Sequence, residues 1–177
     1  MTSLFESVSD FSTGRETIRR RPYGVIEVID GRFRRINFRP WPKIISLAEV
    51  QWLGQRTHQK LHADACRLYF NQPLASRDYL ALKYVVSSFG TSYRTILTVQ
   101  WALDEVARIK GSQAVVCDVT NDRITDRMML RWGWESHLND SPRRHYIKRY
   151  YGTYPQTIFS EPLEQTIPEQ TAASRRD

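Results

Sequence analysis

The stretch from Ser112 to Gly152 limits the possible folds more than any other part of the sequence, because short apolar runs alternate there with turn residues. Residues 114–119 form an apolar run of the length of one buried strand. A helix is expected to follow, capped at its start by the side chain of Asn121 and ended by Gly133. Two more strands are predicted, at residues 134–137 and 145–151. This order of elements indicates an α+β fold.

The helix expected after Asn121 carries two stripes of residues that recur every four positions. The apolar residues at this spacing are Ile124, Met128 and Trp132. The basic residues at this spacing are Arg123, Arg127 and Arg131. The apolar stripe predicts a buried helix face. The basic stripe is interpreted as a solvated face, and the alternative is a surface that contacts phosphate groups.

An N-terminal β-hairpin is the clearest local prediction. Residues 23–38 contain two β-rich runs around Asp30-Gly31, a dipeptide that suits the positive φ angles of a type I′ turn. A two-residue turn predicts the pairs Ile29 with Arg32, Val28 with Phe33, Glu27 with Arg34, and Val25 with Ile36. Glu27 and Arg34 would then attract each other across the two strands.

Two longer helices are predicted, at residues 46–70 and 92–110, and the second ends at Gly111. The first contains three metal-ligand types at i, i+4 and i+8, namely His58, His62 and Cys66. Positions eight apart lie about 12 Å apart along a helix axis. One ion therefore cannot bind all three side chains, and we expect no metal site.

Residues 77–89 leave two alternatives open. Tyr79, Leu82, Val86 and Phe89 recur near helical spacing, which favours a helix over the whole segment. The β-rich run 84–86 instead favours a strand over residues 80–86.

The flanks and the composition indicate one domain at residues 21–155. Residues 1–20 are expected to form a flexible arm, and residues 156–177 a disordered polar tail. The chain of 177 residues has a net charge of +7 and no apolar run of about 18 residues, so we expect no membrane partner. Its two cysteines, Cys66 and Cys117, are interpreted as reduced core residues of a cytoplasmic protein.

Residues 92–151 resemble the C-terminal half of the GNAT N-acetyltransferase superfamily. The matching pieces are the strand ending in Val119-Thr120-Asn121, the helix closing on Arg131-Trp132-Gly133-Trp134-Glu135, and the final strand His145-Tyr146-Ile147-Lys148. The resemblance implies a GNAT-like mixed sheet flanked by helices, with a strand before the helix at residues 92–110. It also implies acetyl-CoA as the cofactor and an amine as the acyl acceptor.

The resemblance places the cofactor-binding residues at the start of the central helix and after the following strand. These residues are Gly90, Ser92, Arg94 and Asn121. In this superfamily, backbone N–H groups of a glycine-containing loop hold the cofactor pyrophosphate. The loop of this chain departs from that pattern at two positions. Ser87 stands where a basic or amide residue is usual, and counting back from Gly111 puts Arg94 where a glycine belongs.

The position of the proton donor also departs from the superfamily pattern. Seven residues after Asn121, where the family usually has a tyrosine, stands Met128, which cannot donate a proton. Tyr93 and Tyr151 are both open as replacements, and the catalytic residues are unknown. The expected function is therefore an acyl-CoA-dependent N-acetyltransferase or a degenerate relative without activity.

Binding to nucleic acid or another polyanion is the alternative function. Between Arg15 and Lys43 there are nine basic and three acidic residues, so an excess of six charges lies around the predicted hairpin. A second basic cluster, at residues 143–149, is interleaved with tyrosines that suit stacking on bases. The same residues also suit the end of a half-buried strand, which is the interpretation we prefer.

Overall fold

A computed structural model describes residues 6–42, 64–138 and 141–155. In chain order, the elements are β1 (Glu6–Val8), α1 (Arg15–Arg20), β2 (Tyr23–Ile29), β3 (Arg32–Phe38), β4 (Ala65–Asn71), β5 (Tyr79–Ser87), α3 (Tyr93–Lys110), β6 (Ala114–Val119), α4 (Asp126–Arg131), β7 (Glu135–His137) and β8 (Arg144–Arg149). The predicted α+β class is confirmed.

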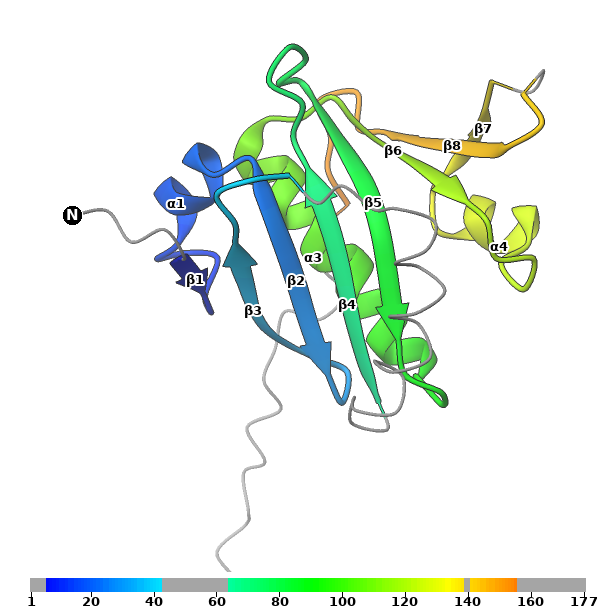
Figure 1. The fold of residues 1–177 in the computed structure, drawn as a ribbon, viewed down its shortest axis with the longest axis horizontal. Coiled ribbons are helices and arrows are strands. Elements are labelled where there is room, and N and C mark those ends of the chain that lie inside the picture. The colour runs from blue at the N-terminus through cyan, green and yellow to red at the C-terminus, as the bar shows by residue number, and fades with distance from the viewer. Residues whose placement is uncertain (1–5, 43–63, 139–140, 156–177) are drawn as a thin grey trace, which may run out of the picture.

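The described strands form one mixed sheet in the order β1-β3-β2-β4-β5-β6-β8-β7 (Figure 1). Neighbouring strands run antiparallel except β5 and β6, which run parallel and are connected through α3. The strand, helix, strand order expected from the superfamily resemblance is thus present in the described part of the chain.

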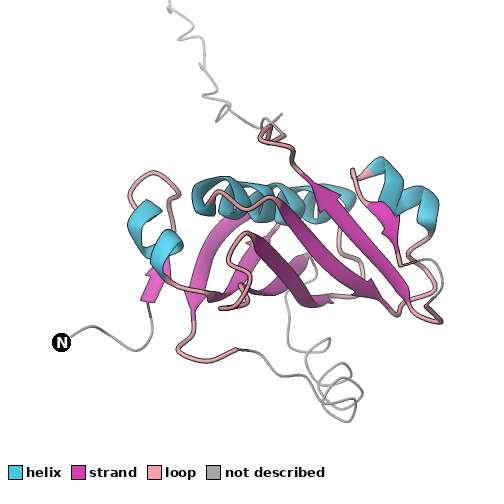
Figure 2. Cartoon of the chain, turned by 90° about the horizontal axis from the view of Figure 1, so that it is seen from above, coloured by secondary structure: helices cyan, strands magenta, loops and turns pink. Residues whose placement is uncertain are grey.

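Helix α3 lies across one face of the sheet, and α4 lies on the same side (Figure 2). The core fills the space between α3 and the sheet. Its fully buried members include Ile26, Ile36, Phe38, Phe70, Leu80, Leu103, Val106 and Val115. Side chains that alternate along β2, β4 and β6 supply the sheet side of this core, as the two-residue period of a strand requires.

The predicted hairpin is confirmed at its turn and altered further along its strands. Asp30 and Gly31 have φ angles of 52° and 68°, which a type I′ turn needs. A bulge after Glu27 shifts the register, so Glu27 lies opposite Arg35 instead of Arg34. Glu27 is buried, and its carboxylate binds both Arg35 and Arg67.

The helix predicted at residues 46–70 is wrong for its last part. Residues 65–71 form β4, in which Cys66, Leu68 and Phe70 point into the core while Arg67 and Tyr69 point to the other face. Because Cys66 and Phe70 are four positions apart, this pattern fits a helix as well as a strand. Pairing with β2 and β5 makes the segment a strand. Residues 46–63, with His58 and His62, lie outside the described residues.

Residues 79–87 form a strand, so the helix prediction for residues 77–89 is wrong and the strand alternative is confirmed. Leu80 and Val86 are six positions apart but are buried on opposite faces of the sheet, because a bulge between Leu82 and Tyr84 reverses the alternation of the strand. The run 84–86, one tyrosine and two valines, is the informative signal in this segment, because aromatic and β-branched residues favour strands.

Helix α3 matches its prediction, with Ser92 as the N-cap and Gly111 in the left-handed conformation at the C-cap. The shorter helix α4 starts later than predicted. Thr125, not Asn121, is its N-cap and accepts a hydrogen bond from the N–H of Met128. Asn121 instead accepts a bond from the N–H of Arg123 in the preceding turn, which keeps it outside the helix.

Part of the segment expected to be a flexible arm belongs to the sheet. Residues 6–8 pair with β3, and Ile18 of α1 is completely buried. Glu6 of β1 also binds Arg20 and Arg21, and these ion pairs hold the end of α1 against β1.

Both cysteines are free and buried, and burial raises the pKa of each thiol to about 12. Within the described residues, no helix is long and apolar enough to cross a membrane.

Candidate functional site

The candidate site lies where the two parallel strands separate. Strands β5 and β6 pair only between Tyr79–Leu82 and Ala114–Cys117. Beyond this point β5 continues beside β4, and β6 continues beside β8. We call the region between Lys83–Ser87 and Asp118–Val119 the β5–β6 fork, and it faces the start of α3 in Figure 1.

A bulge in β5 coincides with the point of separation. Tyr69 lies opposite Tyr84 and Phe70 lies opposite Leu82, so Lys83 is the extra residue. A bulge bends its strand and increases the local twist. The bend turns the end of β5 away from β6, which accounts for the end of their pairing.

The fork leaves apolar surface exposed on the helix side of the sheet. Leu68 and Val85 are opposite each other on β4 and β5 and therefore share a face. Leu68 is only 2% exposed, whereas Val85 is 42% exposed. The difference shows that the cover provided by α3 and α4 does not extend over Val85.

The N-terminus of α3 is held by a carboxylate. Ser92 donates from its N–H and its hydroxyl to the two oxygens of Asp64, at 2.9 and 2.8 Å. Burial by itself would raise the pKa of Asp64, but hydrogen bonds from Thr95 and Ser92 outweigh it and hold this pKa below its ordinary value. Asp64 is therefore ionised at neutral pH and places a negative charge at the positive end of the helix.

The predicted cofactor residues Gly90, Ser92 and Arg94 come together at this helix start. Gly90 has a φ of 93°, and the loop after it leads directly to the cap. Arg94 is exposed, and the aliphatic part of its side chain lies against Gly31 of the β2–β3 turn. Gly31 also donates its N–H to the hydroxyl of Thr95, so the hairpin turn holds the first turn of α3 in place.

The fourth predicted residue, Asn121, lies on the other side of the fork, two positions after the end of β6. Its side chain is engaged in the local turn with Arg123. Met128, at the position where the superfamily usually has tyrosine, is half-buried in α4. The structure therefore places Asn121 across the fork from Gly90, Ser92 and Arg94, not beside them.

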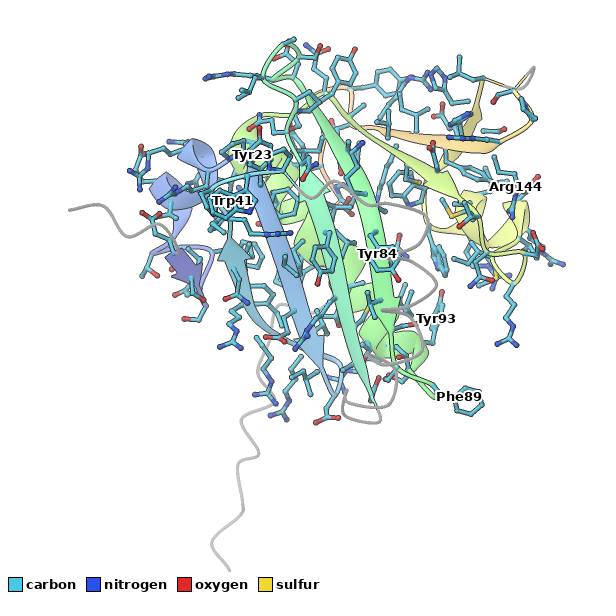
Figure 3. All side chains as sticks on the ribbon, in the orientation of Figure 1. Tyr23, Trp41, Tyr84, Phe89, Tyr93 and Arg144 are labelled. Atoms are coloured by element: carbon cyan, nitrogen blue, oxygen red, sulfur yellow. The ribbon has the colours of Figure 1, made fainter. Side chains whose placement is uncertain are left out.

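The two tyrosines open as proton donors occupy opposite ends of the sheet. Tyr93 is the first residue of α3 and is 56% exposed beside the fork, with Phe89 nearby at the end of β5 (Figure 3). Tyr151 follows the residues of β8 that pair with the start of β6, at the end away from the fork. Of the two, only Tyr93 is placed near the candidate site.

The opposite end of the β5–β6 pair is closed by a buried polar cluster. Lys148 of β8 donates to Asp104 of α3 at 2.7 Å, and the Tyr150 hydroxyl donates to the other Asp104 oxygen at 2.8 Å. Burial raises the pKa of Asp104, and the charge of Lys148 opposes this effect. These three side chains fix α3 to the sheet.

Most cations of the basic cluster at residues 143–149 are bound within the protein. Lys148 binds Asp104, Arg149 binds Glu135, and Arg144 binds Asp126. These pairs match the interpretation of the cluster as the end of a half-buried strand. The basic stripe is also shortened, because Arg123 precedes α4 and only Arg127 and Arg131 lie on the helix.

The sequence pattern does not point to one residue of the site. Asp64 falls within the helix predicted at residues 46–70, but it directly precedes β4 and binds the start of α3. A helix start leaves its first backbone N–H groups without acceptors, so the predicted start of the helix at Ser92 is the signal that indicates a nearby acceptor such as a carboxylate.

Among the described residues, no group of histidine, cysteine, aspartate and glutamate side chains could hold a metal ion.

Comparison with known proteins gives few matches. No protein-family model matches the chain, and no curated protein matches it. Among solved structures, the chain is similar to a crystal structure of nourseothricin acetyltransferase, with 11% sequence identity and a TM-score of 0.41. The similarity covers 83% of this chain and 99% of that one.

Proposed function

We propose that this protein is a GNAT-like N-acyltransferase that binds the acyl-pantetheine arm of an acyl-CoA in the β5–β6 fork and uses an amine as acceptor. The observation that carries the proposal is the end of parallel pairing at Leu82 and Cys117, directly beside the start of α3. Such a fork offers an unpaired strand edge, with which the amides of an extended ligand can pair.

The edge of β5 suits the pantetheine arm. From Tyr84 to Ser87, β5 pairs with β4 on one side and has no strand partner among the described residues on the other. Backbone N–H and C=O groups on a free edge can pair with the amides of an extended ligand. Val85, which is 42% exposed, offers apolar contact for the methylene groups of that arm.

The start of α3 fits the pyrophosphate of CoA less well. Asp64 already accepts the N–H and hydroxyl bonds of Ser92, and its negative charge repels a second anion there. A thioester that lacks a diphosphate avoids this repulsion. We therefore expect the pantetheine arm, and not the nucleotide, to supply most of the affinity.

When bound, an acyl-CoA supplies an activated thioester as the acyl donor. Of Tyr93 and Tyr151, Tyr93 lies beside the fork, and its hydroxyl can hold the proton that a departing thiolate requires. Replacing Tyr93 with phenylalanine is then expected to lower turnover while leaving ligand affinity unchanged.

Calorimetric titration of acetyl-CoA and acetyl-pantetheine into the full chain and its Asp64→Asn variant tests this proposal. The asparagine keeps one oxygen that can accept the N–H of Ser92, presents its NH2 group as a donor to the hydroxyl of Ser92, and removes the charge. We expect the variant to bind acetyl-CoA about tenfold more tightly and acetyl-pantetheine with unchanged affinity. Asp78→Asn, at the opposite end of β5, is the control for a change in net charge.

Two results would contradict the proposal. No binding of either ligand at millimolar concentration removes the function itself. Binding of acetyl-CoA that is unaffected by Asp64→Asn leaves the function standing but removes the role of Asp64.

A non-catalytic relative of the acyltransferases is the second candidate, and one observation favours it specifically. Met128 occupies the position at which the superfamily usually has a tyrosine proton donor, and its thioether cannot donate a proton. The second candidate predicts that acetyl-CoA binds but releases no free thiol in the presence of a panel of amines. A thiol reagent measures this release directly, because the two cysteines of the protein are buried.

A further inference from the structure

Three polar side chains meet on the face of the sheet that points away from α3. Asp118 on β6 lies directly opposite His145 on β8. Their chain neighbours Cys117 and Tyr146 belong to the core beneath α3, so Asp118 and His145 point to the other face. Ser141 lies in the connection between β7 and β8, just before His145.

These side chains form one continuous hydrogen-bonded chain. The Oγ of Ser141 lies 2.9 Å from Nε2 of His145. On the other side of the ring, Nδ1 of His145 lies 2.5 Å from Oδ1 of Asp118. The order of atoms is hydroxyl, imidazole and carboxylate, the order in which a serine nucleophile is activated.

The carboxylate of Asp118 determines the direction of these hydrogen bonds. An ionised carboxylate only accepts, so Nδ1 of His145 carries the proton that is donated to Asp118. In the neutral imidazole, Nε2 is then the acceptor for the hydroxyl of Ser141, whose oxygen also accepts the N–H of Arg143 at 3.2 Å. This is the tautomer in which the imidazole can remove a proton from the serine.

A backbone hydrogen bond holds Ser141, whose N–H donates to the carbonyl of Leu138. Leu138 has a φ of 55°, which is unusual for a residue with a side chain. Residues in such conformations persist where the surrounding structure needs them, and they concentrate at functional sites. Ser141 and His145 are both partly exposed, so a reagent can reach the hydroxyl.

We infer that Ser141, His145 and Asp118 form a second acyl-transfer site, in which Ser141 is acylated by an ester or thioester. Asp118 is a positioning residue that acts through His145. The site lies on the sheet face opposite α3, and it does not depend on the proposed binding of acyl-CoA in the fork.

The reaction balances with water as the second reactant. Oγ of Ser141 forms a bond to the carbonyl carbon of the ester, and its proton passes to Nε2 of His145. The bond between that carbon and the leaving oxygen or sulfur then breaks, and the leaving group takes the proton from His145. Water attacks the acyl-serine in the same way, which releases a carboxylic acid and restores the serine.

Labelling with a fluorophosphonate probe tests the inference, because this reagent carries no CoA and reacts with activated serines. We expect one equivalent of label on Ser141, identified by peptide mass spectrometry, and none in Ser141→Ala. His145→Gln is expected to slow labelling about 100-fold. His137→Gln is the matched control, since His137 lies opposite His145 on β7 and is outside the hydrogen-bonded chain.

The positioning role of Asp118 has its own test. Asp118→Asn is expected to slow labelling at least tenfold without changing the melting temperature, and Asp118→Glu to restore most of the rate. The inference is overturned if folded protein shows no label on Ser141. It is also overturned if His145→Gln and His137→Gln label at the same rate, because a merely structural hydrogen bond predicts that result.

Discussion

The two ends of the β5–β6 pair differ sharply in how they are held together. At the end where the strands pair, Val115 is completely buried, and α3 is bound to β8 through Asp104 and Lys148. At the fork, Val85 is 42% exposed, and the strands have separated. The helix that joins the two strands is therefore anchored at one end by a buried ion pair and held at the other by a cap.

This difference indicates that one end of α3 serves mainly stability and the other end is available for a ligand. Buried apolar contacts supply stability at the closed end, and the buried ion pair there is costly to break by removing one partner. The fork keeps an unpaired strand edge, an exposed valine and a charged cap, features that contribute less to stability and can serve a ligand. If this account holds, substitutions at the closed end should cost more stability than equivalent substitutions at the fork.

The largest effect is expected for Lys148→Met at the closed end. The substitution leaves the carboxylate of Asp104 buried without its cation, and breaking such a pair costs about 3–5 kcal/mol. Urea unfolding measures the loss. The control is Arg149→Met, which breaks the exposed pair with Glu135 and should cost at most about 1 kcal/mol. Equal losses of unfolding free energy in the two variants would contradict the claim that the buried pair, and not the exposed one, fixes the closed end.

A smaller effect is expected for a matched pair of valines. Val115→Ala at the closed end removes two buried methyl groups and should cost about 2–3 kcal/mol. Val85→Ala at the fork makes the same chemical change at an exposed position and should cost less than about 0.5 kcal/mol. The measurement is the free energy of unfolding of both variants. If Val85→Ala lowers it as much as Val115→Ala does, Val85 is buried and the fork is not open.

The cap of α3 should contribute about 1 kcal/mol. Ser92→Ala removes the acceptor for the N–H of Thr95 and the hydroxyl that binds Asp64. The control is Ser76→Ala in the turn before β5, which should change the unfolding free energy by less than about 0.5 kcal/mol. A neutral result for Ser92→Ala would mean that neighbouring groups, not the cap, hold the fork end of the helix.

The last prediction concerns the pH dependence of stability at the closed end. Burial, together with the charge of Arg77, lowers the pKa of Lys110 to about 8. Between about pH 8 and the ordinary lysine pKa near 10.4, the unfolded chain holds a proton that the folded protein has released. The unfolding free energy should therefore rise with pH over this window. In Lys110→Met this rise should be absent, and an identical pH profile in the variant would contradict the assignment.

Some elements could be predicted from the sequence because their signals are local. The Asp30-Gly31 turn and the capped helix α3 depend on residues within a few positions of each other, and both are confirmed. The strands at residues 65–71 and 79–87 were harder to predict. Their apolar residues fit two periods, and the decision between them rests on pairing partners far away in the chain.

The candidate site shows the same limit. The sequence pointed to Gly90 and Ser92 through the helix start, and both lie beside the fork. It could not predict Asp64, which binds Ser92 from the position just before β4, or the contact between His145 and Asp118. Hydrogen bonds between residues distant in the chain depend on strand register, and a bulge such as that at Lys83 changes the register without a clear sequence signal.

Amide hydrogen exchange of β5, with and without acetyl-pantetheine, tests the central claim most directly. In the free protein, the amides of Lys83–Ser87 that face the fork should exchange quickly, while those of Tyr79–Leu82 should be protected by pairing. Ligand should slow exchange within Lys83–Ser87 and the first turn of α3. Protection that appears only elsewhere, or fork amides already as slow as those of the paired segment, would contradict the account.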